Sequence, residues 1–409
     1  MYLLISLFAL YASPAFAQKN DCSKIANYHD FYHCTLERHP RMSLTVEKRR
    51  EGEAALSKSG QWINPAITLK SVGGSLAGES SGSTEVDVSF PISQLWTRGS
   101  QKAVGSAEKR LAEVEADVSL SDLKKELLKD LFRLRQIEDD YEMVNETLDT
   151  FGTIQKQLQG RRARGPEQEI TLSLLQLASS DYQLKRNHVQ VERGEIFSKL
   201  KAIWGNDFEV KRNYFPPIRD RWPEINAGTT SGHSLALQKS IAESEKASAE
   251  YSLAKFDSLP TIAIGPSLER STSGPQRTWS YGFNVTASLP IFSWNGGGKD
   301  LARSRAIQAD LESSYTEKKF QYEKDVLVQK YKSAVESLAK GSGRQDIKKK
   351  HHQIDSYFKQ GLASGAVVIE AHRQIGEYME SQHEHENAAI ESYIELMTLT
   401  GGDIEGILQ

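Results

Sequence analysis

The stretch "VTASLPIFSWNGGGKDLARSRA", residues 285–306, changes from a strand pattern to a helix pattern within a few residues. Its first half alternates apolar and polar residues, which is typical of a β-strand. Its second half opens a long run with helical spacing. Pro290 and the three glycines of residues 296–298 stand between the halves, and proline is tolerated where a strand ends. The stretch therefore predicts a direct junction between a sheet and a long helix.

The same junction occurs earlier in the chain, as "VDVSFPISQLWTRGSQKAVGSA" at residues 86–107. The two stretches align without gaps at a shift of 199 positions, so that Pro91 matches Pro290 and Gly99 matches Gly298. Other glycines recur in the same order further on. Matches of several kinds in one order indicate a duplicated unit.

The duplication suggests a division of the chain into four parts. Residues 1–17 are apolar and end in Ala15-Phe16-Ala17, whose small residues at −3 and −1 predict signal-peptide cleavage before Gln18. The first structural repeat is expected at 18–205 and the second at 231–409. A proline-rich connector at 206–230 separates them.

Each repeat is expected to contain a helix, a β-hairpin and a long helical hairpin, in that order. We place the first helices at 42–58 and 234–256, and the strands at 64–73, 84–92, 260–269 and 280–289, with Gly/Ser-rich turns between paired strands. Apolar residues from Leu120 to Leu158 then follow steps of three or four, which predicts a helix of about 55–60 residues, ~85 Å long. A return helix runs to about Trp204. The second repeat copies this plan, with one long helix from about Lys299 to the break at Gly361–Gly365 and a return helix to about Leu399.

Composition excludes several classes of protein. The net charge of −3 gives no basic excess for binding nucleic acid. The mean hydropathy of −0.51 is too low for a bundle of membrane helices. No run beyond the first seventeen residues reaches the roughly 20 apolar residues of a membrane-spanning helix.

The strands decide the architecture. Four amphipathic strands cannot close a membrane barrel alone, because such barrels begin at about eight strands, and open edges in lipid would leave backbone groups unpaired. A barrel shared among several chains satisfies both constraints. Trp96 and Trp294, just beyond the strands, fit an aromatic belt at the membrane boundary, although ordinary packing explains them equally well.

The duplicated plan, the S-[FL]-P-I junctions, the alanines at the helix starts and "YFKQGLASGAVVIEAHRQIGEY" resemble the TolC-type outer-membrane efflux proteins. The resemblance covers nearly the whole mature chain. It implies a mostly α fold in which a homotrimer forms an α-barrel of long antiparallel helical hairpins. Four strands per chain would complete a 12-stranded transmembrane β-barrel in outer-membrane lipid, with a long periplasmic extension.

The implied function is the passive exit duct of a tripartite efflux pump, docked on a periplasmic membrane-fusion adaptor and an inner-membrane pump of RND or ABC type. Alternatives are an exit duct for type I protein secretion and an exported coiled-coil scaffold without a channel. The exported substrate is left open.

The resemblance also places the helical turns at the periplasmic tip, where the adaptor docks. The residues concerned are Gly160, Arg161, Arg162, Arg164, Gly165, Gly361, Leu362 and Gly365. The glycines allow tight reversals, and the arginines form a cationic cluster that suits an acidic adaptor or is simply a solvated turn. Glu370 falls where the family has an acidic constriction, and three copies would make an anionic ring. Alternatively, Glu370 stabilises the start of its helix.

No catalytic motif is present, so we expect a protein that is not an enzyme and has no cofactor. "HEHEN" at 383–387 lacks the second histidine of the H-E-x-x-H zinc signature. His351, His352, His383 and His385 are weak candidates for a metal site between adjacent helices, against solvated side chains as the alternative. Cys22 and Cys34 could form a disulfide in an exported protein, which the spacing does not decide.

Overall fold

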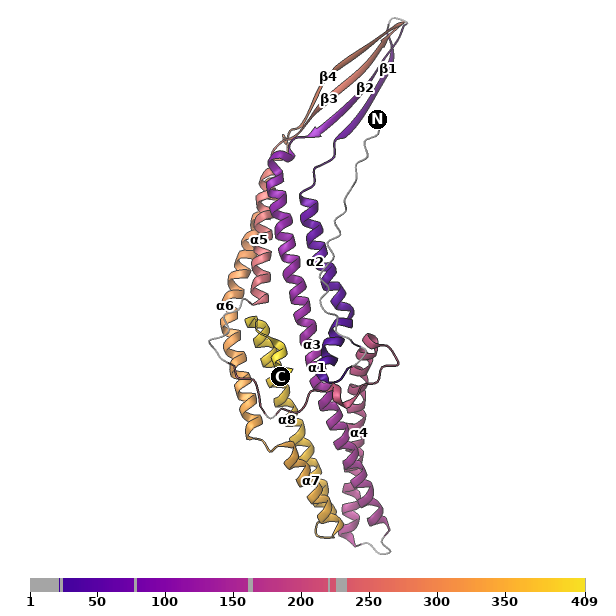
Figure 1. Ribbon diagram of the computed structural model, residues 1–409, viewed down its shortest axis with the longest axis vertical. Helices are drawn as coiled ribbons and strands as arrows, with labels where there is room; N and C mark the ends of the chain where they lie inside the picture. Colours follow the sequence, from indigo (N-terminus) through magenta and orange to yellow (C-terminus); the bar gives the residue numbers. More distant parts are fainter. Residues whose placement is uncertain are drawn as a thin grey trace.

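The computed structural model describes Cys22 and residues 25–76, 79–160, 165–219, 221–225 and 234–408. The predicted signal peptide therefore lies outside the described residues. The molecule is long and narrow, with a β-sheet at one end, helices along its length and two helical turns at the opposite end (Figure 1). We call the end with the helical turns the tip.

The sheet contains four antiparallel strands in the order β1-β2-β3-β4. Their bounds are β1 (Ala66–Leu76), β2 (Glu79–Pro91), β3 (Thr261–Ser273) and β4 (Gln276–Ser288). The pairing of β2 with β3 joins the two hairpins into one sheet. One row crosses the whole sheet, because Leu69 pairs with Val86, Val86 with Leu268, and Leu268 with Tyr281.

The strands are longer than expected, because the predicted Gly/Ser-rich turns are largely strand. Gly74 pairs with Ser81, inside the segment predicted as the first turn. The second hairpin turns at Gly274 and Pro275 alone, and Gly274 has a positive φ of 54°. Glycine and serine favour turns, but here the ladder of backbone hydrogen bonds continues through them.

The first half of the chain has four helices, α1 (Tyr28–Arg38), α2 (Pro40–Ser59), α3 (Gln94–Gln159) and α4 (Pro166–Trp204). Helix α3 has 66 residues, more than predicted, because it continues without a break from the sheet to the tip. Small residues let α2 pack closely against the first turns of α3. A Cβ on Gly52 would lie 2.8 Å from the Ala112 Cβ, and one on Gly105 would meet the side chain of Ser59.

The second half has the α-helices α5 (Leu235–Phe256), α6 (Gly296–Lys340), α7 (Arg344–Lys359) and α8 (Gly365–Thr400). The expectation of one unbroken helix from about Lys299 to Gly361 is wrong, since residues 341–343 interrupt it. Helix α8 stabilises this break, because the Tyr378 hydroxyl and the Gln382 amide both donate to the Ser342 carbonyl at 3.0 Å. Short 3₁₀ helices occur at Arg212–Tyr214 and Ile404–Leu408. No helix among the described residues combines the length and hydrophobicity needed to cross a bilayer.

The main hydrophobic core lies where α1, α3, α4 and α8 meet. Phe31 stacks on Tyr214 of the connector at 4.9 Å between ring centroids, and Tyr331 of α6 donates to the Pro223 carbonyl at 2.7 Å. Through Tyr214 and Pro223, the described part of the connector packs against the core.

Cys22 and Cys34 form a disulfide beside this core. The disulfide bonds α1 to a residue before the helix, so the twelve-residue spacing is not a helical distance.

A buried ion pair joins α3 to α8 within this region. Arg135 contacts Glu386, and the two side chains are only 7% and 9% exposed. The same Glu386 oxygen accepts a hydrogen bond of 2.9 Å from Gln136. The pair ties the long helix of the first half to the last helix of the second.

Candidate functional site

One face of the sheet is apolar and uncovered. Tyr281 and Phe283 of β4 are 92% and 89% exposed, which is unusual for large aromatic side chains. The register places further exposed apolar residues on the same face, namely Ile67, Leu69, Val86, Phe90, Ile264, Leu268, Trp279 and Val285. No described segment of the chain covers this face.

The opposite face of the sheet is polar. The Lys70 ammonium lies 3.2 Å from a Glu85 carboxylate oxygen and 3.0 Å from one of Asp87. The Ser267 hydroxyl donates to Glu85 at 3.1 Å. Arg270 and Arg277 on the apolar face and Val72 on the polar face are exceptions. The division is otherwise the one that a sheet between lipid and an aqueous interior requires.

Both outer strands keep an open edge. Among the described residues, β1 pairs only with β2 and β4 only with β3. Each of these two strands therefore presents one row of backbone donors and acceptors without a partner strand in the described chain. Open edges of this kind are sites at which another strand can add.

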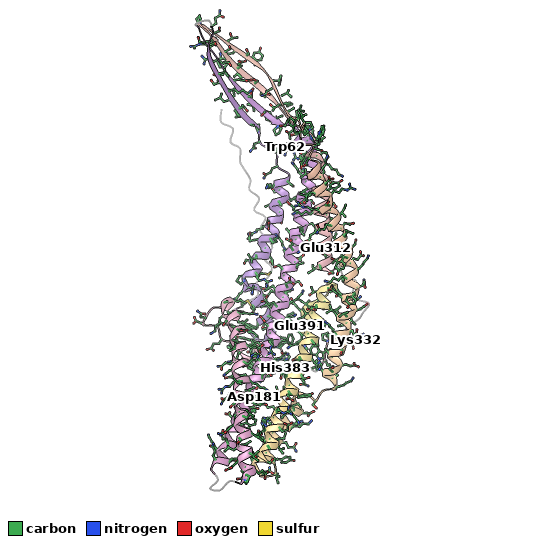
Figure 2. The ribbon with its side chains drawn as sticks, turned by 180° about the vertical axis from the view of Figure 1, so that it is seen from behind. Trp62, Asp181, Glu312, Lys332, His383 and Glu391 are labelled. Atoms are coloured by element: carbon green, nitrogen blue, oxygen red, sulfur yellow. A yellow bond between two sulfur atoms is a disulfide. The ribbon has the colours of Figure 1, made fainter. Side chains whose placement is uncertain are left out.

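Aromatic residues gather where the sheet meets the helices. Trp294 and Phe292 are exposed, whereas Trp96 is half-buried. Trp62 lies at the same junction, as Figure 2 shows, and the Arg98 guanidinium stacks over its ring at 4.1 Å. The position suits the predicted aromatic belt, with Trp62 as a member that the sequence analysis did not single out.

The structure brings the helix ends that flank the two predicted turns to the same end of the molecule, the tip (Figure 1). Gly160 ends α3 and Gly165 precedes α4, while Gly361 follows α7 with a φ of +73° that favours glycine. A Cβ on Gly365 would lie 2.8 Å from the Thr171 methyl group of α4, so this glycine permits close contact between the two hairpins.

The structure describes Leu362 among the other predicted tip residues, but not the three arginines. Leu362 is exposed, as a docking residue requires. Arg161, Arg162 and Arg164 lie outside the described residues, so their role stays a prediction.

Glu370 lies in the second turn of α8, and its carboxylate is hydrogen-bonded to side chains of the same helix. Its carboxylate accepts hydrogen bonds from Arg373 at 2.7 and 2.9 Å and from Gln374 at 2.8 Å. These bonds, with the Arg373 bonds first, lower the pKa of Glu370 to about 2. Arg373 also contacts Glu377, so two carboxylates share one guanidinium. The cluster therefore keeps a net charge of −1 per chain, which is a weak rather than a strong anionic site.

The four predicted histidines do not form one site. His383 faces Asp140 of α3, with 3.1 Å between Nδ1 and a carboxylate oxygen, and lies well above the tip in Figure 2. His352 and His385 are exposed. His351 is buried, and its partner is His372, which the sequence analysis missed. The usable signal was the spacing of four residues from His351 to Asp355, which puts both on one helical face.

Two helices carry exposed apolar stripes along their length. The stripe on α4 consists of Ile170, Leu174, Leu177, Leu184 and Val191. The stripe on α6 consists of Ile307, Leu311, Tyr315 and Tyr322. Spacings of three, four and seven residues keep each stripe on one side of its helix, which is typical of a face that packs on another helix.

Comparison with known proteins identifies the fold. No family model and no curated protein sequence match the chain. Solved outer membrane channels do match over nearly the whole length, and the chain has their fold. The predicted resemblance to TolC-type proteins is thereby confirmed for the fold, including long helices and a four-stranded sheet in one chain.

Three of these structures show the extent of the likeness. The CmeC outer membrane channel of Campylobacter jejuni superimposes with a TM-score of 0.70 at 14% identity, covering 93% of this chain and 88% of CmeC. The open state of the Neisseria gonorrhoeae MtrE channel gives 0.68 at 13% identity, with coverage of 94% and 91%. The outer membrane protein VceC of Vibrio cholerae gives 0.67 at 13% identity, with coverage of 92% and 97%.

Proposed function

We propose that the protein is an outer-membrane channel, rather than an enzyme, and serves as the passive exit duct of an efflux pump. The observation that carries this proposal is the sheet. It has one uncovered apolar face, one polar face and two open edges, in a chain with the fold of outer membrane channels.

The open edges support a homotrimer. If β4 of each chain pairs with β1 of the next, three sheets of four strands close into one barrel of twelve, above the minimum of about eight. The apolar face then meets outer-membrane lipid, and the Lys70–Glu85–Asp87 network faces the aqueous interior. Closure also pairs every edge group, which lipid cannot do.

The helical part supports the same assembly. The stripes on α4 and α6 are too extensive to remain in water, and a neighbouring chain supplies the helices that cover them. The result is a tube of helices that continues the barrel into the periplasm. A soluble coiled-coil scaffold would need neither the uncovered sheet nor its lipid-facing aromatic residues.

The tip is proposed as the docking end for a periplasmic adaptor, and through it for an inner-membrane pump of RND or ABC type. Exposed Leu362 offers an apolar contact there. The Glu370–Arg373–Glu377 cluster, with its net charge of −1, is proposed to favour cations weakly where the three tips converge.

The test uses two neighbouring residues on opposite faces of β4. Phe283→Arg places a cation on the lipid face, at a cost of roughly 2–4 kcal/mol per chain near the bilayer centre. Asn284→Arg places the same charge on the polar face. We expect Asn284→Arg to give a trimer in the outer-membrane fraction that conducts ions in planar bilayers, and Phe283→Arg to lose both. Equal membrane recovery and conductance of the two variants would overturn the proposed orientation of the sheet.

A further inference from the structure

A compact group of nitrogen and oxygen ligands lies between α7 and α8, near the tip. His351 and Asp355 stand four residues apart on α7, and His372 faces them from α8. The Nε2 atoms of His351 and His372 are 2.9 Å apart, and His372 Nε2 lies 3.7 Å from Asp355 Oδ1. One ligand atom from each residue lies within 4.8 Å of the others.

The surroundings hold these groups in a state that can bind a cation. His372 is 1% exposed, and its Nδ1–H donates to the Val368 carbonyl at 2.8 Å. That bond fixes the tautomer and leaves the Nε2 lone pair directed at the group. The Thr150 hydroxyl donates to Asp355 Oδ2 at 3.4 Å, whereas Oδ1 is buried with no hydrogen-bond partner. A buried carboxylate oxygen without a partner is costly unless something binds it.

We propose that His351, Asp355 and His372 form a resident site for a divalent transition metal of the zinc class. Two imidazoles and one carboxylate are a common three-ligand set for zinc, with water in the fourth position. Ligand atoms of a tetrahedral zinc site lie about 3.3 Å apart at bond lengths of about 2.0–2.1 Å. The His351–His372 and His372–Asp355 separations each differ from that value by about 0.4 Å. The remaining pair of ligand atoms lies within 4.8 Å, so it needs the larger adjustment of the side chains. His351 gives up its Nε2 proton by changing to the Nδ1-protonated tautomer.

The position indicates what the metal does there. The break at residues 341–343 separates α7 from α6, so α7 depends on its contacts with α8. A metal with ligands on both helices fixes α7 against α8 and thereby stiffens one hairpin of the tip. Burial of His351 and His372 argues for a structural ion rather than for cargo in transit. The inference is independent of whether the protein conducts.

The test is metal binding by the full-length protein in detergent, after treatment with a chelator and dialysis. We expect calorimetry with zinc chloride to show about one saturable zinc per chain, and cobalt(II) to give the strong visible absorption of a four-coordinate site. Asp355→Asn, which keeps the shape of the side chain, should weaken zinc binding by at least 10–100-fold, as should His372→Ala. His385→Ala, an exposed histidine on α8, is the matched control and should bind as the parent does.

Two results would overturn the proposal. One is the absence of saturable binding in the parent protein, which would make the histidine pair a hydrogen bond between neutral rings. The other is unchanged zinc affinity in Asp355→Asn, which would place the bound metal elsewhere. Circular dichroism of each variant checks the fold, and Asp355→Asn decides the matter if His372→Ala does not fold.

Discussion

Replacing Glu386 by alanine should destabilise the protein more than any exposed charge deletion on the same helix. The substitution leaves the Arg135 guanidinium buried without the carboxylate that it contacts, and it removes the acceptor of the Gln136 amide. Breaking a buried ion pair from one side costs about 3–5 kcal/mol, because the remaining charge loses its partner but not its burial. Glu384, two residues earlier on α8, is exposed and serves as the control.

The expected change can be followed as a melting temperature in detergent. A chain of 409 residues has an unfolding entropy of about 0.86 kcal/mol/K, so 3–5 kcal/mol corresponds to about 4–6 °C if it unfolds as one unit. Glu384→Ala should shift the midpoint by less than 1 °C. The double variant Arg135→Met/Glu386→Leu should recover most of the loss, since an apolar pair of similar size is often neutral or stabilising. Equal shifts for Glu384→Ala and Glu386→Ala would refute the reasoning.

Three further predictions concern other parts of the structure. Cys34→Ser should lower stability by roughly 3 kcal/mol, the loop entropy of a disulfide between residues twelve apart, and dithiothreitol should then have no additional effect on the melting temperature. Gly105→Ala should destabilise by about 1–3 kcal/mol through its clash with Ser59, whereas Gly99→Ala, on the same helix but facing open space, should stabilise by up to about 1 kcal/mol in the same melts. His39 caps α2 by accepting from the Arg41 amide, and burial, followed by the Arg41 charge, lowers the pKa of its ring. The stability that the neutral ring contributes is complete above the unfolded pKa of about 6.5 and is lost as pH falls through the lower folded pKa. Asparagine at this position caps the helix without titrating. The difference in melting temperature between pH 7.5 and pH 5 should therefore be smaller for His39→Asn than for the parent protein.

Much of the fold could be predicted because its signals are periodic. The alternation in "VDVSF" and "FNVTASL" places apolar side chains on one face, and the structure shows that face uncovered. The leucine stripe from Leu120 to Leu158 similarly predicts the buried side of α3. Periodicity identifies a face whether water, lipid or protein lies against it.

The errors arise where local composition and tertiary contacts disagree. Gly74 and Ser75 are predicted to lie in a turn, yet pairing with β2 extends the strand through them. In the opposite case, a helix is predicted through residues 341–343 without a break, but hydrogen bonds from Tyr378 and Gln382 to the Ser342 carbonyl stabilise an interruption there. A partner from another element decides both cases.

The histidine cluster was missed for a related reason. Adjacent histidines and the "HEHEN" run drew attention in the sequence, although neighbours on a helix point in different directions. The buried pair joins His351 to a residue 21 positions later, across the turn between α7 and α8. Only the packing of the two helices shows that these rings meet. The disulfide was left open for the same reason, because the path of the chain before α1 decides it.

The open edges of β1 and β4 have a consequence for biogenesis. A barrel made by one chain completes its last row of hydrogen bonds within a single molecule, at a rate that does not depend on how many copies are present. In the proposed trimer the final rows can form only between molecules, so the rate of closure would rise with the local density of protomers. Before another protomer binds, the sheet of each chain has an unpaired strand edge on both sides and an exposed apolar face between them. If the proposed trimer is correct, the yield of assembled protein therefore depends on how many copies are made together.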